Sequence, residues 1–287
     1  MPGQRSCVWT WSLAEGQPTL VFESDELLLE APNWIDRSNL LVNGAGDLHR
    51  LTLAGELQPV GHQGLPSLNN DHVIARSGES VFASANDGQL YEISLLDGAS
   101  RQITTASGAP GVHHYLHGVN ADGQRLAFVG VRALAKGGSS TALYTVSRDG
   151  TDYRQLTDGS SAVDGCEFAP DDSWLYYNSE EFDGHAQIAR CRPDGTAAEQ
   201  LTFDDAVNWF PHLSPDGMNA VYLAFPSGTE GHPANLRVQL KLAPGLDWNA
   251  PDTVVRIFGG QGSLNVNSWS PDSSAFAFVS YPITPPV

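Results

Sequence analysis

Residues 149–157 read DGTDYRQLT and residues 194–202 read DGTAAEQLT, so the same phrase returns after 45 residues. Between the copies lie FAPDD at 168–172 and WLYYN at 174–178, a turn followed by an apolar, aromatic run. Asp-Gly pairs favour tight turns, because Asp hydrogen-bonds the local backbone and Gly tolerates a positive φ. A unit of this length with four strand-like runs is typical of one blade of a β-propeller.

The rest of the chain repeats this unit. Further blades are predicted at 31–60, 65–104, 113–157 and from 208 onward. Two strands within 7–24 lack an inner partner, and the segment 265–281 ends after two strands. We therefore predict an all-β, six-bladed β-propeller in which these two segments share the sixth blade and residues 1–287 form a single domain. An open array of sheets or a β-sandwich is the alternative.

The composition indicates a soluble all-β chain with 29 glycines, 18 prolines and a formal net charge of −18. That charge argues against nucleic-acid binding through phosphates, and no apolar run is long enough to span a membrane. The N-terminus lacks the apolar core of a signal peptide, which predicts a cytoplasmic protein, or a periplasmic one if a leader was removed. The three cysteines are too few for a disulfide framework. We expect the protein to be a monomer.

Candidate site residues follow from a comparison of equivalent positions on the inner strands. Residues that only pack should resemble one another between blades, whereas the third to sixth blades place different polar and aromatic side chains there. The ligand-binding candidates are Tyr115, Trp209, Asn265 and Asn267. The first two blades offer only Pro32 and Pro66, so we expect a lopsided site that opens beside them. A concave site with a few convergent polar groups is the default binding-site hypothesis.

Carboxylates and histidines among these positions are candidate catalytic groups. Asp164 and Glu167 are the best candidates for the carboxylate pair that glycosidases need, and His117 and His212 are the candidate catalytic histidines. No Gly-x-Ser-x-Gly motif is present for nucleophilic catalysis. The alternative is that both histidines fill the channel mouth and hydrogen-bond carbonyl groups or water.

Several phrases resemble a known family of propellers. LSPDG at 213–217, WSPDS at 269–273 and the Asp-Gly turn followed by Gln-Leu-Thr are similar to the repeats of TolB-like six-bladed propellers. NWFPH at 208–212, EGHP at 230–233 and FGGQG at 258–262 resemble a TolB-related subgroup. A more distant resemblance is to oligogalacturonate lyases, larger propellers with His and Gln ligands to manganese. The likeness covers nearly the whole chain and implies the propeller fold.

Histidines and a glutamine are also candidate metal ligands, since neutral imidazole suits transition metals. The predicted ligands are His117, His212 and Gln261, with His232 as an alternate, around a divalent cation such as manganese or calcium. No pair of residues has the spacing typical of zinc proteases or zinc fingers.

Two functions remain open from the sequence. The first is a non-catalytic module that binds an oligosaccharide or a peptide at the channel mouth. The second, implied by the lyase resemblance, is a metal-dependent carbohydrate-active enzyme, either a polysaccharide lyase or a hydrolase. A lyase needs positive charge near the uronate carboxylate, and Arg132, Lys136 and Arg237 are the cationic candidates.

Overall fold

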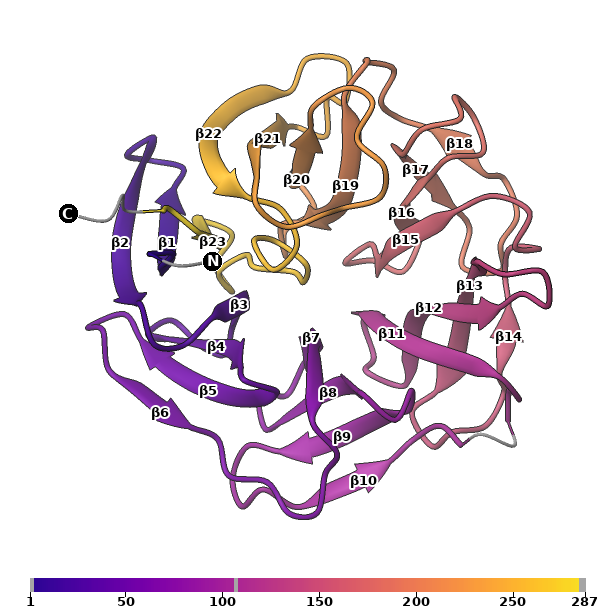
Figure 1. The fold of residues 1–287 in the computed structure, drawn as a ribbon, viewed down its shortest axis with the longest axis horizontal. Coiled ribbons are helices and arrows are strands. Elements are labelled where there is room, and N and C mark those ends of the chain that lie inside the picture. The colour runs from indigo at the N-terminus through magenta and orange to yellow at the C-terminus, as the bar shows by residue number, and fades with distance from the viewer. Residues whose placement is uncertain (1–2, 106–107, 284–287) are drawn as a thin grey trace.

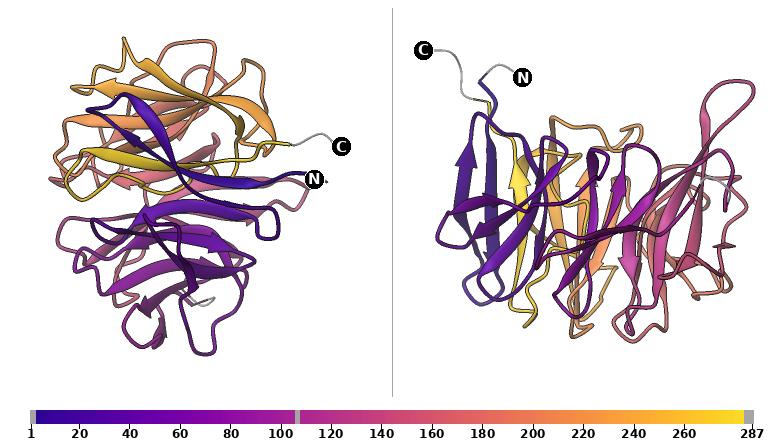
Figure 2. Two further views of the ribbon diagram at one scale, coloured as in Figure 1. Left: turned by 90° about the vertical axis from the view of Figure 1, so that its left-hand side faces the viewer. Right: turned by 90° about the horizontal axis from the view of Figure 1, so that it is seen from below.

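The computed structural model describes residues 3–105 and 108–283, which form a ring of six β-sheets (Figure 1). Seen from the side, the ring is a disc whose strands run between its two faces (Figure 2). This arrangement confirms the predicted all-β, six-bladed β-propeller. Among the described residues, no helix has the length and apolarity needed to cross a lipid bilayer.

Five blades contain four antiparallel strands each, in chain order from the centre outward, within the described part of the chain. Blade 1 consists of β3 (Leu29–Trp34), β4 (Asn39–Gly44), β5 (Asp47–Thr52) and β6 (Leu57–Pro59). Blade 2 consists of β7 (Leu68–Ile74), β8 (Ser80–Ala85), β9 (Leu90–Ser94) and β10 (Ser100–Gln102). Blade 3 consists of β11 (Val112–Val119), β12 (Arg125–Ala133), β13 (Ser139–Ser147) and β14 (Arg154–Gln155). Blade 4 consists of β15 (Val163–Phe168), β16 (Leu175–Ser179), β17 (Gln187–Cys191) and β18 (Glu199–Gln200). Blade 5 consists of β19 (Val207–Leu213), β20 (Asn219–Phe225), β21 (Leu236–Pro244) and β22 (Asp252–Gly259).

Blade 6 combines the two ends of the described chain. Its strands are β2 (Gln17–Ser24), β1 (Ser6–Ser12) and β23 (Ala275–Ser280), and β1 pairs antiparallel with β23. The segment predicted as its innermost strand is irregular and contributes one bridge, between Trp269 and Phe276. Side chains compete with the ladder there, because Asn265 Oδ1 accepts from Gly262 N at 2.7 Å and Asn267 Oδ1 from Trp269 N at 3.0 Å.

The apolar core lies between the blades rather than at the centre of the ring. Among the described residues, six apolar clusters bridge neighbouring blades. One of them packs Val8 and Val279 of blade 6 against Leu40 and Val42 of blade 1. Because both faces of a blade are covered, the inner strands are free to present polar side chains toward the axis.

The repeated Gln-Leu-Thr phrase has a structural role at the outer strands. The hydroxyl oxygen of Thr202 accepts a hydrogen bond from Ile188 N at 2.9 Å, and Gln200 Nε2 donates to Thr202 O at 2.7 Å. Thr157 and Gln155 make the same two contacts in blade 3, with distances of 2.9 and 2.8 Å. The phrase therefore ends a short outer strand by satisfying backbone groups that the ladder leaves open.

Candidate functional site

A cavity of about 460 Å³ lies among the inner strands β7, β11, β15 and β19. Its lining includes most of the side chains that the sequence places at the channel mouth. These are Tyr115, His117, Asp164, Trp209, His232, Gln261 and Asn265. The inner strands supply the first four, and loops that follow β20 and β22 supply the others.

Two β-bulges change the directions of two of these side chains, Asp164 and Trp209. The pairing register shifts between Asp164 and Glu167 in β15 and between Trp209 and His212 in β19. Within the second bulge Phe210 adopts a φ of 57°, which is costly for a bulky residue, and its N–H donates to Asn178 Oδ1 at 3.2 Å. A bulge turns the strand locally and re-aims its side chains, which is why bulges are frequent beside functional sites.

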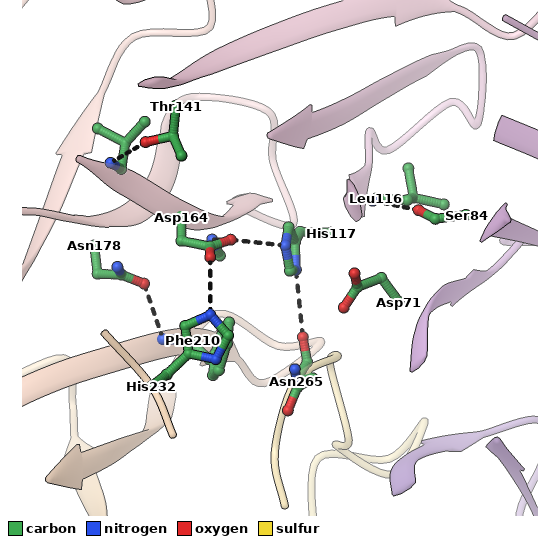
Figure 3. A network of polar contacts seen from close by, with 12 residues as sticks. Asp71, Ser84, Leu116, His117, Thr141, Asp164, Asn178, Phe210, His232 and Asn265 are labelled. Atoms are coloured by element: carbon green, nitrogen blue, oxygen red, sulfur yellow. Dashed lines mark hydrogen bonds and ion pairs between the residues drawn. The ribbon is translucent and has the colours of Figure 1, made fainter. Parts of the chain in front are cut away.

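The centre of the cavity holds a chain of two histidines and one aspartate (Figure 3). His117 Nε2 lies 3.0 Å from Asp164 Oδ1, and His232 Nε2 lies 3.5 Å from Asp164 Oδ2. The other ring nitrogen of His117, Nδ1, faces the carbonyl oxygen of Asn265 at 3.4 Å. Both nitrogens of His117 thus face oxygen acceptors, which is the environment of a protonated imidazole.

The electrostatics of the cavity agree with this geometry. Burial opposes a charge on His117, but the hydrogen bond to Asp164 and the negative charges of Asp71 and Asp164 outweigh it and raise the pKa of His117 to about 9. Burial also opposes the charge of Asp164, yet its bonds to His117 and His232 hold its pKa below the ordinary value. His117 is therefore a buried cation at neutral pH and has no free lone pair for a base.

Asp71 is a site residue that the sequence prediction missed. It lies on β7 of blade 2, is 5% exposed and lines the cavity, so the expectation that blade 2 offers little chemistry is wrong. Pro66 precedes β7, whose bulge falls between Leu68 and His72. Burial, partly offset by the charge of His117, raises the pKa of Asp71 to about 6.

A loop between β22 and β23 forms another wall of the cavity. Asn265 Nδ2 donates to Gln261 Oε1 at 3.0 Å, and Gln261 Nε2 donates to Asn70 Oδ1 at 3.4 Å. These bonds connect the loop to β7 across the mouth of the cavity. They also leave little of the Gln261 side chain free to act as a metal ligand.

The indole of Trp209 is a polar group at the wall of the same cavity. Trp209 is 6% exposed, and its Nε1 is buried without a hydrogen-bond partner among the described residues. A buried donor without an acceptor costs about 1 to 3 kcal/mol, so a hydrogen bond to this donor would be favourable.

Three predicted site residues belong to a different network. Glu167 accepts hydrogen bonds from Leu213 N at 3.1 Å and from Asn267 Nδ2 at 2.7 Å, and its Oε2 lies 2.7 Å from His212 Nδ1. His212 Nε2 faces the carbonyl oxygen of Leu264 at 3.0 Å, and the ring is fully buried. Glu167 and Asn267 line a second cavity, of about 390 Å³, to which His117 also contributes.

The candidate metal ligands are divided between these two places. His117, His232 and Gln261 line the first cavity, whereas both nitrogens of His212 contact protein oxygens elsewhere. Within residues 3–105 and 108–283, no group of three His, Cys, Asp or Glu residues is arranged to hold a metal ion. The predicted set of ligands is therefore not brought together around one point.

Comparison with known proteins places the chain among bacterial propellers, although no family model matches its sequence. An uncharacterized protein of Agrobacterium fabrum is 32% identical over 285 residues, which cover 96% of this chain and 92% of the relative. A solved structure of a candidate TolB from Agrobacterium tumefaciens is 31% identical, with a TM-score of 0.87 and 99% of both chains covered.

More distant structures share the fold alone. TolB from Acinetobacter baumannii has a TM-score of 0.60 at 14% identity, and the match covers 94% of this chain and 56% of that one. An oligogalacturonate lyase in complex with manganese has a TM-score of 0.58 at 12% identity, with 88% of this chain and 74% of the lyase covered.

Proposed function

Because the chain belongs to the TolB-like family of six-bladed β-propellers, we propose that it is a non-catalytic module that binds a short peptide or glycan segment in the polar cavity. The observation that carries the proposal is the unpartnered Nε1 of Trp209 at the wall of a cavity that several blades build together. A hydroxyl or carbonyl group of the ligand would accept its hydrogen bond. A volume of about 460 Å³ is in the range of small-molecule sites.

The states of His117 and Asp164 argue against either of them as a general base. His117 faces two acceptors and has a pKa raised to about 9, and both carboxylate oxygens of Asp164 contact histidines. His117 has no free lone pair to accept a substrate proton at neutral pH, and the lowered pKa of Asp164 makes its carboxylate a weak base. Their geometry instead makes a rigid, charged floor for a ligand.

The lyase alternative needs positive charge for a uronate carboxylate. None of the described residues that line the cavity is Lys or Arg. The cationic candidates from the sequence, Arg132, Lys136 and Arg237, are exposed and lie outside the lining. The positive charge of the two histidines is already partly offset by the carboxylate of Asp164, which contacts both rings.

A panel of ligands measured by isothermal titration calorimetry tests the proposal. The panel contains a tetrapeptide, a neutral gluco-oligosaccharide, a chitin tetramer and an oligogalacturonate. We expect at least one of the first three to bind with one-to-one stoichiometry and without turnover. Tyr115→Phe removes a hydroxyl from the cavity and should weaken that binding by roughly tenfold, the loss of one good hydrogen bond.

Tyr222→Phe is the matched control. Its hydroxyl also lacks a hydrogen-bond partner among the described residues, but Tyr222 is not part of the cavity lining. This variant should bind like the parent. A Tyr115→Phe variant that binds as tightly as the parent, or a panel without any binder, would contradict the proposal. Release of an unsaturated product from oligogalacturonate, with a metal found by elemental analysis, would establish the lyase alternative instead.

A further inference from the structure

Asp71 lines the cavity, and only one oxygen of its carboxylate accepts a hydrogen bond from the described residues. Asp71 Oδ2 accepts a hydrogen bond from Asn69 Nδ2 at 3.1 Å. Its Oδ1 has no hydrogen-bond partner among the described residues, although the side chain is 5% exposed and lines the cavity. The carboxylate lies on the side of His117 and Asn265 (Figure 3). No side chain or backbone group of the described residues donates to Oδ1, so this oxygen is available to a donor in the cavity.

The neighbouring groups decide which donor would suit this oxygen. Two carboxylates, Asp164 and Asp71, already act on the cavity's histidines, and the described lining contains no Lys or Arg. An anionic group placed here would meet Asp71 without gaining a free cation. A cationic donor would gain a charge-assisted hydrogen bond, which is roughly twice as strong as a neutral one.

Two aromatic residues on the walls complete the environment. Tyr115 lines the cavity close enough to Asp71 and Asp164 for their charges to raise its pKa, after the larger effect of burial, and its hydroxyl has no hydrogen-bond partner within the described chain. Its oxygen is a second acceptor for a donor with several N–H groups. Trp209 lines the same space, and its Nε1 is a buried donor without a hydrogen-bond partner among the described residues.

We propose that the cavity recognises a primary ammonium group that bonds to Asp71 Oδ1 and lies beside an oxygen acceptor of the same ligand, which bonds to Trp209 Nε1. The proposal rests on the binding function given above and names its chemical class. A free peptide N-terminus has this pattern, because its ammonium group neighbours a carbonyl. A glucosamine unit has it as well, because its ammonium group neighbours hydroxyl groups. The protein's formal net charge of −18 favours the approach of such cations.

Two matched pairs of ligands distinguish the contribution of the ammonium group to binding from that of the rest of the ligand. One pair is tetra-alanine with a free or an acetylated N-terminus, and the other is a glucosamine tetramer or its N-acetylated form. Binding to the full chain is measured by calorimetry at pH 7.5. We expect the free amine of at least one pair to bind roughly tenfold or more tightly than its acetylated partner. The pair that responds identifies the source of the amine.

The Asp71→Asn variant tests whether the charge of Asp71 is responsible for ammonium recognition. It keeps the shape of the side chain but removes the charge, and it should abolish the preference for the free amine. Asp25→Asn removes the same charge from an exposed position outside the cavity and should retain the preference. If Asp71→Asn fails to fold, the comparison of the two pairs on the parent protein still decides the proposal.

Each outcome has one meaning. Equal or tighter binding of the acetylated forms would overturn ammonium recognition while leaving the cavity a binding site. The same preference in Asp71→Asn as in the parent would overturn the role of Asp71. If none of the four ligands binds, ammonium recognition is overturned. The wider ligand panel then tests the binding function separately.

Discussion

Replacing Glu167 with alanine is expected to lower the free energy of unfolding by about 3 to 5 kcal/mol. The glutamate is 6% exposed and holds three donors at once, on Leu213, Asn267 and His212. Alanine would leave these donors buried without an acceptor. Chemical denaturation followed by tryptophan fluorescence measures the loss.

Glu167→Gln is the conservative control for that experiment. Its carbonyl oxygen can still accept from Leu213 N and Asn267, and its amide can donate to His212 Nδ1 while Nε2 donates to Leu264 O. We therefore expect most of the stability to return with glutamine. A Glu167→Ala variant within about 1 kcal/mol of the parent would show that the network contributes little to the fold.

Raising the pH should destabilise the protein through His117. The pKa of this histidine is about 9 in the folded protein and 6.5 in an unfolded chain. A group with a raised folded pKa contributes stability that is complete below pH 6.5 and is lost as the pH rises through 9. The expected loss from this group is about 3 kcal/mol, because each pKa unit corresponds to about 1.4 kcal/mol. Asp71 and Asp164 are the charged groups that face it.

The measurement is the free energy of unfolding of the parent and of His117→Gln at several values between pH 6 and 10. The parent should lose more stability over this range than the variant does. His113→Gln, which changes an exposed histidine two strand positions from Tyr115, should follow the parent. Parallel profiles for the parent and His117→Gln would contradict a buried cation at this position.

Local patterns predicted the blades because their causes are local. An Asp-Gly turn places glycine at a positive φ, as Gly150 and Gly195 show with 86° and 85°. Thr151 N and Thr196 N donate to the turn aspartates, Asp149 and Asp194, at 3.0 Å in both copies. Turn residues and outer-strand caps are therefore readable from a single chain.

The site was only partly predictable, because strand alternation fails across a bulge. The comparison of blades assigned Trp209 and the neighbouring position His212 to one mouth, but the register shift between them separates the cavity wall from the buried network. The sequence prediction missed Asp71 for a related reason. The run from Asn69 to Asp71 has the composition of a turn, yet it lies within β7, where Asn69 Oδ1 accepts from Asp71 N at 2.9 Å. The sequence signal that could have revealed Asp71 is this polar run from Asn69 to Asp71, shortly before the Ser77-Gly78 turn.

A crystal structure of the full chain with the tightest ligand of the panel would show where the ligand binds. We predict that the ligand occupies the cavity among β7, β11, β15 and β19, with its donor on Asp71 Oδ1 and its acceptor on Trp209 Nε1. The chain from His117 through Asp164 to His232 should remain in place beneath it. A ligand bound in the second cavity or on the outer surface, with Asp71 and Trp209 untouched, would contradict the account.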